Sequence, residues 1–60
     1  MSITFAEVHD ALKVLERTEA VSVIGVSQTD EDVTIHAEFA GREVHFDFDA
    51  DEFFTGFRKD

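Results

Sequence analysis

Two segments in which apolar and polar residues strictly alternate dominate the second half of the chain. One covers residues 33–39, the other covers residues 44–48, and Gly41 lies between them. Strict alternation is the pattern of a strand that buries one face and exposes the other to water. Two such strands joined through a glycine predict an antiparallel hairpin, so we expect the chain to fold around a sheet.

The residues next to Gly41 predict how this hairpin is aligned. Gly41 followed by Arg42 suits a two-residue type II′ loop, which would place Ala40 opposite Glu43. On the polar face, the opposing side chains would then be Glu38 with His45 and His36 with Asp47. A loop shifted back by one residue would instead place like side chains opposite each other, which charge repulsion disfavours.

The amino-terminal segment carries the signature of a helix start. Thr4 is placed as the N-cap, and Glu7 completes a capping box with it. The apolar residues that follow recur at helical spacing and form one stripe: Phe5, Val8, Leu12 and Leu15. We therefore expect a helix that begins at Phe5 and turns this stripe toward the core.

A further strand is expected over residues 21–28, which are rich in β-branched side chains. The polar residues that follow would form the turn into the next strand. In the alignment that we expect, Ile24 and Val26 face the helices, whereas Val21 and Val23 point to the other side of the sheet. A shift by one residue would exchange the two sides, because successive strand residues point in opposite directions.

The end of the chain repeats the helix-start signature. Asp49 is placed as an N-cap, with Glu52 at the capping-box position. The apolar residues of this segment share one face at helical spacing: Ala50, Phe53, Phe54 and Phe57. A short helix is therefore expected over residues 50–59, with the basic pair Arg58 and Lys59 at the end where the helix dipole favours cations.

Together these segments predict an α+β fold with the order α-β-β-β-α. The three strands would form an antiparallel meander with both helices on one face, in a single compact domain spanning residues 1–60. Apolar residues make up 43% of the chain and include seven Phe, which is enough to nucleate a core.

The expected order resembles that of double-stranded RNA-binding domains, as a likeness of topology over the whole length. Where that family carries a lysine cluster at the start of the last helix, this chain has Asp49, Asp51 and Glu52. Affinity for nucleic acid rests on cationic side chains that contact phosphates. No nucleic-acid partner is therefore expected.

The charge balance of the chain is strongly one-sided. Asp and Glu number 14 and Lys and Arg number five, which gives a net charge of -9. Such a chain repels itself at low ionic strength, whereas molar salt shortens the Debye length to about 3 Å and relieves the repulsion. With scarce Lys, no Cys and many small residues, the composition resembles that of small acidic cytosolic proteins of salt-loving archaea. This resemblance implies a halophilic, cytoplasmic protein and carries no activity with it.

Several classes of function do not fit the sequence. No stretch approaches the roughly 20 apolar residues of a membrane helix, and the start lacks a signal-peptide pattern, so we expect a soluble protein with no membrane partner. The absence of Cys excludes thiolate chemistry. No Ser stands in a Gly-rich elbow, and a core of this size encloses little pocket. We therefore expect no enzyme and no cofactor.

Four polar residues are candidates for a metal site: His36, Glu38, His45 and Asp47. In the expected register they converge on the exposed face of the sheet, where imidazole and carboxylate groups could hold zinc or another transition metal. Ordinary pairing of histidine with carboxylate is the alternative. The acidic run that begins at Asp47 imitates a calcium loop, but Glu52 and Arg58 replace its required Gly and Glu.

Five residues are candidates for an interface, because they would form a strip of low charge on the outside: Val14, Val21, Val23, Gly25 and Ala40. The strip predicts a homodimer. As function we expect a small non-enzymatic interaction module that binds a copy of itself and also a protein partner. Two alternatives stay open: a protein that binds a metal or small ligand on the histidine and carboxylate face, and an accessory regulator that acts through a protein partner.

Overall fold

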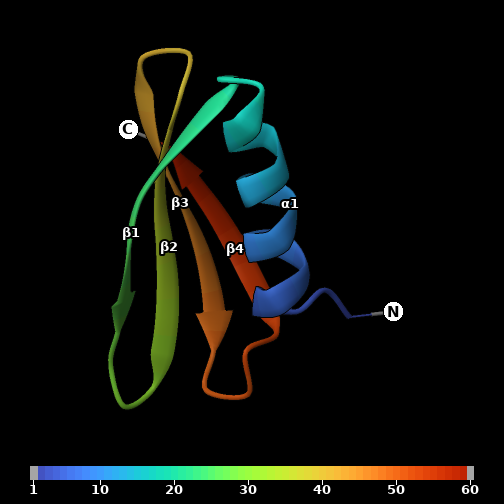
Figure 1. The fold of residues 1–60 in the computed structure, drawn as a ribbon. Coiled ribbons are helices and arrows are strands. Elements are labelled where there is room, and N and C mark those ends of the chain that lie inside the picture. The colour runs from blue at the N-terminus through green and yellow to red at the C-terminus, as the bar shows by residue number, and fades with distance from the viewer. Residues whose placement is uncertain (1, 60) are drawn as a thin grey trace.

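The computed structural model describes residues 2–59, as one helix followed by four strands (Figure 1). The elements are α1 (Phe5–Arg17), β1 (Val21–Gln28), β2 (Asp32–Phe39), β3 (Arg42–Asp49) and β4 (Phe54–Lys59). The strands form one antiparallel sheet in the order β1-β2-β3-β4, and α1 packs across one of its faces. The fold is α-β-β-β-β, so the predicted α-β-β-β-α order is wrong.

The predicted start of the first helix is confirmed. α1 begins at Phe5, and the Thr4 hydroxyl accepts a hydrogen bond from the Glu7 N–H at 3.4 Å. The same hydroxyl donates to the Glu7 carboxylate at 3.1 Å, so the two side chains cap the helix together. Leu12 is buried, and Phe5 packs against the core from the first turn.

The prediction of a second helix over residues 50–59 is wrong. The Asp49 carboxylate accepts hydrogen bonds from the N–H groups of Asp51 and Phe53, both at 2.9 Å, and these bonds close a turn between β3 and β4. Glu52 has a positive φ of 68°, which is incompatible with a right-handed helix. The chain then continues as β4, which pairs with β3.

A bulge explains why β4 looks helical in the sequence. Phe57 pairs with Phe46 and Phe54 pairs with Phe48, and the register shifts between these pairs so that Thr55 is an extra residue. The bulge lets two strand residues that are three apart share one face. Residues three apart also share one face of a helix, so the spacing alone does not separate the two structures. Without a last helix, the topological likeness to double-stranded RNA-binding domains is lost.

The expected loop between β2 and β3 is also wrong. Phe39 pairs with Arg42, so the two loop residues are Ala40 and Gly41. Their φ angles are 54° and 80°, and positive values at both positions define a type I′ turn, whose twist matches that of the flanking strands. This alignment places His36 opposite His45.

The alignment of β1 agrees with the expected one at Val26, which pairs with Ile35, and differs from it earlier in the strand. Val21 is buried and Val23 packs against the core, so these two residues face α1 and the prediction that they point outward is wrong. Val23 pairs with Ala37, and the next pair is Gly25 with His36, which leaves Ile24 as an extra residue. This second bulge exposes Ile24.

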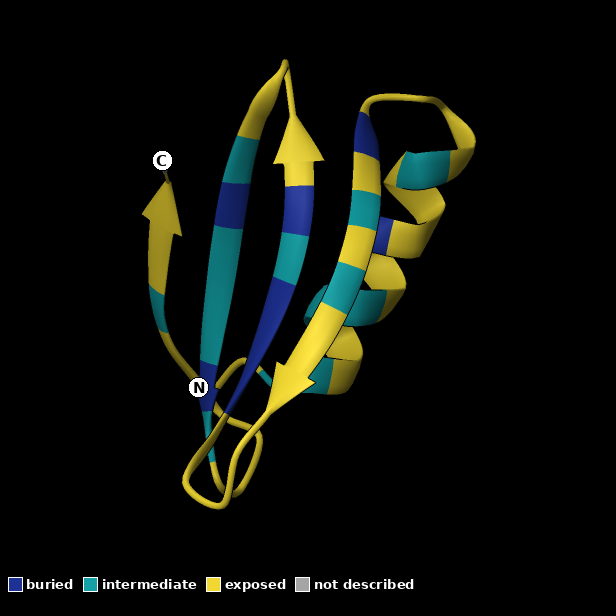
Figure 2. Cartoon of the chain, turned by 90° about the vertical axis from the view of Figure 1, so that its left-hand side faces the viewer, coloured by how far each residue is buried: buried dark blue, intermediate teal, exposed yellow. Residues whose placement is uncertain are grey.

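The core lies between α1 and the two central strands, where the buried bands in Figure 2 are concentrated. Its buried apolar residues are Leu12, Val21, Val33, Ile35, Ala37, Val44 and Phe48. Phe48 and Ile35 are fully buried. The Phe5 ring meets the Phe48 ring edge to face at a centroid distance of 5.4 Å, so the first turn of α1 is packed directly onto β3.

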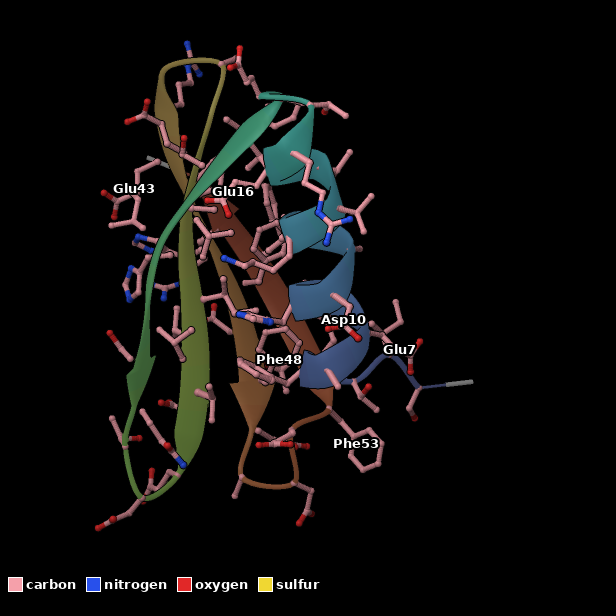
Figure 3. The ribbon with its side chains drawn as sticks, viewed as in Figure 1. Glu7, Asp10, Glu16, Glu43, Phe48 and Phe53 are labelled. Carbon is pink, nitrogen blue, oxygen red and sulfur yellow. The ribbon has the colours of Figure 1, made fainter. Side chains whose placement is uncertain are left out.

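A carboxylate of α1 fastens the helix to the outer strand β1. Glu16 accepts the Val23 N–H at 3.0 Å through one oxygen and the Lys13 ammonium at 3.0 Å through the other. The hydrogen bond from Val23 is the main reason why the pKa of Glu16 lies below its ordinary value. Glu16 (Figure 3) therefore satisfies one backbone N–H group of the outer strand β1.

Phe48→Ala is expected to lower the free energy of unfolding by about 3–5 kcal/mol, because it empties a fully buried site. Phe53→Ala is the matched control, since this ring points away from the core (Figure 3) and is 42% exposed. Urea unfolding followed by circular dichroism measures both. Equal losses in the two variants would contradict the placement of Phe48 at the centre of the core.

Ala40→Asn tests the turn between β2 and β3. Asn tolerates a positive φ better than Ala, so we expect the free energy of unfolding to rise by about 1 kcal/mol. With the loop at Gly41 and Arg42, residue 40 would be a strand residue and Asn would lower stability. A loss of stability in the same urea experiment would therefore contradict the type I′ turn.

Candidate functional site

An apolar groove lies on the helix side of the sheet. A helix is about 10 Å wide and neighbouring strands are about 4.8 Å apart, so one helix covers roughly two strands. α1 packs most closely along β1, and the side chains of Phe54 and Phe57 on β4 stay exposed. The groove has a volume of about 260 Å³ and is lined by Leu12, Leu15, Val21, Phe39, Val44, Phe46 and Phe57.

Large apolar side chains stand open to solvent around this groove. Leu15 is 42% exposed, Phe39 is 52% exposed and Phe57 is 50% exposed. The Phe57 ring leans on the Phe46 ring at a centroid distance of 5.1 Å, so β4 presents an aromatic pair to the groove. The lining is entirely apolar, and a contiguous surface of this kind commonly marks a site of association.

The predicted interface strip is not brought together. Val21 and Val23 lie on the helix side, and Val21 also lines the groove. Val14 is exposed on α1, Ala40 lies in the turn before β3, and Gly25 is half-buried opposite His36. Phe57 was not expected on this surface because residues 50–59 were predicted to form a helix. Recognition of β4 as an edge strand would have pointed to Phe57.

Hydrogen-bonding side chains cover the opposite face of the sheet. Asp47 accepts two hydrogen bonds from the Arg58 guanidinium, at 2.8 and 2.9 Å, and one from the Thr34 hydroxyl at 2.9 Å. The bonds from Arg58 are the main reason why the pKa of Asp47 lies below its ordinary value, and the bond from Thr34 adds to the effect. Asp47 therefore ties β3 to both of its neighbours, β2 and β4.

A cluster of two histidines and one glutamate lies further along the same face. The rings of His36 and His45 meet edge to face across β2 and β3, with their centroids 4.6 Å apart. Glu43 Oε2 lies 2.6 Å from His45 Nε2 and 3.8 Å from His36 Nδ1. The hydrogen bond with His45 is the main reason why the pKa of Glu43 lies below its ordinary value. Figure 3 shows Glu43 on the side of the sheet away from α1.

The structure brings together two of the four residues that the sequence nominates for a metal site. His36 and His45 are directly opposite each other, whereas Asp47 is engaged by Arg58. Glu38 is exposed and lies opposite Glu43. Glu43 was missed because the expected loop placed it next to the turn. It lies beside His45 on β3 in either register, and the loop at Ala40 and Gly41 brings it close to His36 as well.

No protein-family model matches this sequence, and searches of curated proteins and of solved structures also return no match. Within residues 2–59, no helix is both long enough and apolar enough to cross a membrane. The apolar groove and the polar face described above are therefore the basis for assigning a function.

Asp47→Asn tests the network on the polar face. Because the pKa of Asp47 is lowered in the folded state, its contribution to stability is present above the unfolded value of about 3.9 and is lost as the pH falls through the lowered pKa. We expect the variant to be less stable than the wild type at pH 6, and the difference to shrink toward pH 2.

Asp30→Asn removes the same charge from the exposed turn between β1 and β2 and serves as the control. Urea unfolding across the pH range measures all three proteins. A constant difference between wild type and Asp47→Asn down to pH 2 would contradict the linkage, as would the same pH dependence in Asp30→Asn.

Proposed function

We propose that this protein is a small non-enzymatic module that associates with a second copy of itself through the apolar groove between α1 and β4. The observation that supports this function is the wholly apolar lining together with the half-exposed rings of Phe39 and Phe57. Burial of such side chains against a partner contributes about 25 cal/mol for each Å² removed from water.

The size of the chain favours a second copy as the occupant. A domain of about 60 residues buries only about 60% of the surface that its unfolded chain exposes, and association is a common way to enlarge the core. The chain has no cysteine, so no disulfide supplements the core. Two-fold symmetry would set the same groove of each copy against the other, with Phe57 of one chain packed on the lining of its partner.

The charge of the chain predicts how this association depends on salt. Two chains of net charge -9 repel each other, whereas the groove itself is lined by uncharged side chains. Salt screens the repulsion and leaves the apolar contact intact, because the Debye length falls to about 3 Å at 1 M. Self-association is therefore strongest at molar ionic strength, in keeping with a salt-adapted protein.

Light-scattering mass at increasing protein concentration and at low and molar salt tests the proposal. We expect the mass of a dimer for the wild type in molar salt, and a dissociation constant at least about tenfold larger for Phe57→Ser, because a central aromatic residue dominates many interfaces. Val14→Ser is the control, since Val14 is 58% exposed on α1 and does not line the groove.

Circular dichroism of each variant confirms that it is folded under the conditions of the mass measurement. A folded wild-type monomer at every salt and protein concentration would contradict self-association. A dimer that Val14→Ser weakens as much as Phe57→Ser would place the contact outside the groove.

A further inference from the structure

The three groups of the histidine–glutamate cluster present nitrogen and oxygen atoms to one point. The candidate ligand atoms of His36, Glu43 and His45 all lie within 4.8 Å of one another. The side chains are partly sheltered, with exposed fractions of 27% for His36, 43% for Glu43 and 16% for His45. We infer that they form a binding site for one divalent transition-metal ion of the zinc type, which is independent of the proposed self-association.

The two distances from the Glu43 carboxylate bracket the separation that such an ion requires. Zinc lies about 2.0–2.2 Å from imidazole nitrogen and carboxylate oxygen, which places tetrahedral ligands about 3.3 Å apart. The observed distances from Glu43 Oε2 are 2.6 Å to His45 Nε2 and 3.8 Å to His36 Nδ1, one on each side of this value. The ion displaces the proton of the hydrogen bond between His45 and Glu43 to solvent, and water completes the coordination.

Ser27 orients one of the histidines for this role. Its hydroxyl lies 2.8 Å from His36 Nε2, which leaves His36 Nδ1 facing Glu43. Histidines that bind metal ions usually have their second ring nitrogen held by a hydrogen bond, which fixes the tautomer and the orientation of the ring. A proton on Nε2 that is donated to Ser27 leaves Nδ1 with the lone pair that an ion requires.

The surrounding charge favours a cation at this point. Glu38 lies directly opposite Glu43 on the same face, and like charges placed opposite each other in a sheet are destabilising. A divalent ion held by Glu43 relieves that repulsion. Arg58 lies opposite His45 on β4, and its guanidinium donates two hydrogen bonds to the Asp47 carboxylate.

The choice of ion follows from the ligand types. Two imidazoles and one carboxylate suit zinc, nickel, copper or iron, whereas magnesium prefers oxygen ligands and keeps its water. Calorimetric titration of the chelator-treated protein with zinc chloride is therefore the first experiment, and magnesium chloride is the comparison. We expect one zinc ion for each chain and no binding of magnesium at the same concentrations.

Matched variants locate the ion. His36→Gln and His45→Gln are each expected to weaken zinc binding at least about tenfold, and Ser27→Ala to weaken it by a smaller factor, as loss of an outer hydrogen bond does. His9→Gln is the control, because His9 stacks on Phe5 at 5.4 Å on the helix and is remote from the polar face. Phe57→Ser is expected to retain zinc binding, which separates this site from the groove.

The histidine ring signals of the wild type in nuclear magnetic resonance provide a test that needs no variant. On addition of zinc, the signals of His36 and His45 are expected to shift and those of His9 to stay. Failure of the wild type to bind zinc, a shift of His9 alone, or unchanged affinity in both His36→Gln and His45→Gln would overturn the inference.

Discussion

The turn at Ala40 and Gly41 sets the alignment of β2 with β3, and both faces of the sheet depend on that alignment. On the helix side it pairs Ile35 with Phe46, which are neighbours in the packing beneath α1. On the other side it pairs His36 with His45. A slip of one residue would change every cross-strand partner. Because the side chains of a strand alternate, it would also turn each side chain to the other face of the sheet. The positive φ of Ala40 is therefore unfavourable in conformational free energy, and the contacts of the whole sheet compensate for it.

Much of the fold follows from patterns that are local in the sequence. The capped helix and the alternating strands are each specified within a few residues, and the structure contains both. The turn at Gly41 is also present, but it lies one residue earlier than expected. The errors in β1 and β4 both come from the outer strands, where a bulge at Ile24 and another at Thr55 interrupt the alternation. A bulge is stabilised by contacts with the neighbouring strand, so a single segment carries little sign of it.

The polar and apolar sites differ in how far they could be foreseen. The two histidines were recognised as candidate ligands because they lie on one face in either register, but the closeness of Glu43 to His36 depends on the turn. The groove could not be foreseen at all while Phe57 was assigned to a helix. Its existence follows from a mismatch of widths, since one helix is too narrow to cover four strands. The two faces therefore offer different chemistry on opposite sides of one thin sheet.

The bond from Val23 to Glu16 also bears on aggregation. β1 is an outer strand without a single charged side chain, and an edge of this kind is an open template for a strand from another molecule. Glu16 takes up one backbone donor of that edge and places a negative charge beside it. The Glu16 carboxylate becomes protonated as the pH falls through its lowered pKa. Below that pH its negative charge no longer opposes the pairing of β1 with strands of other molecules, as in a fibril.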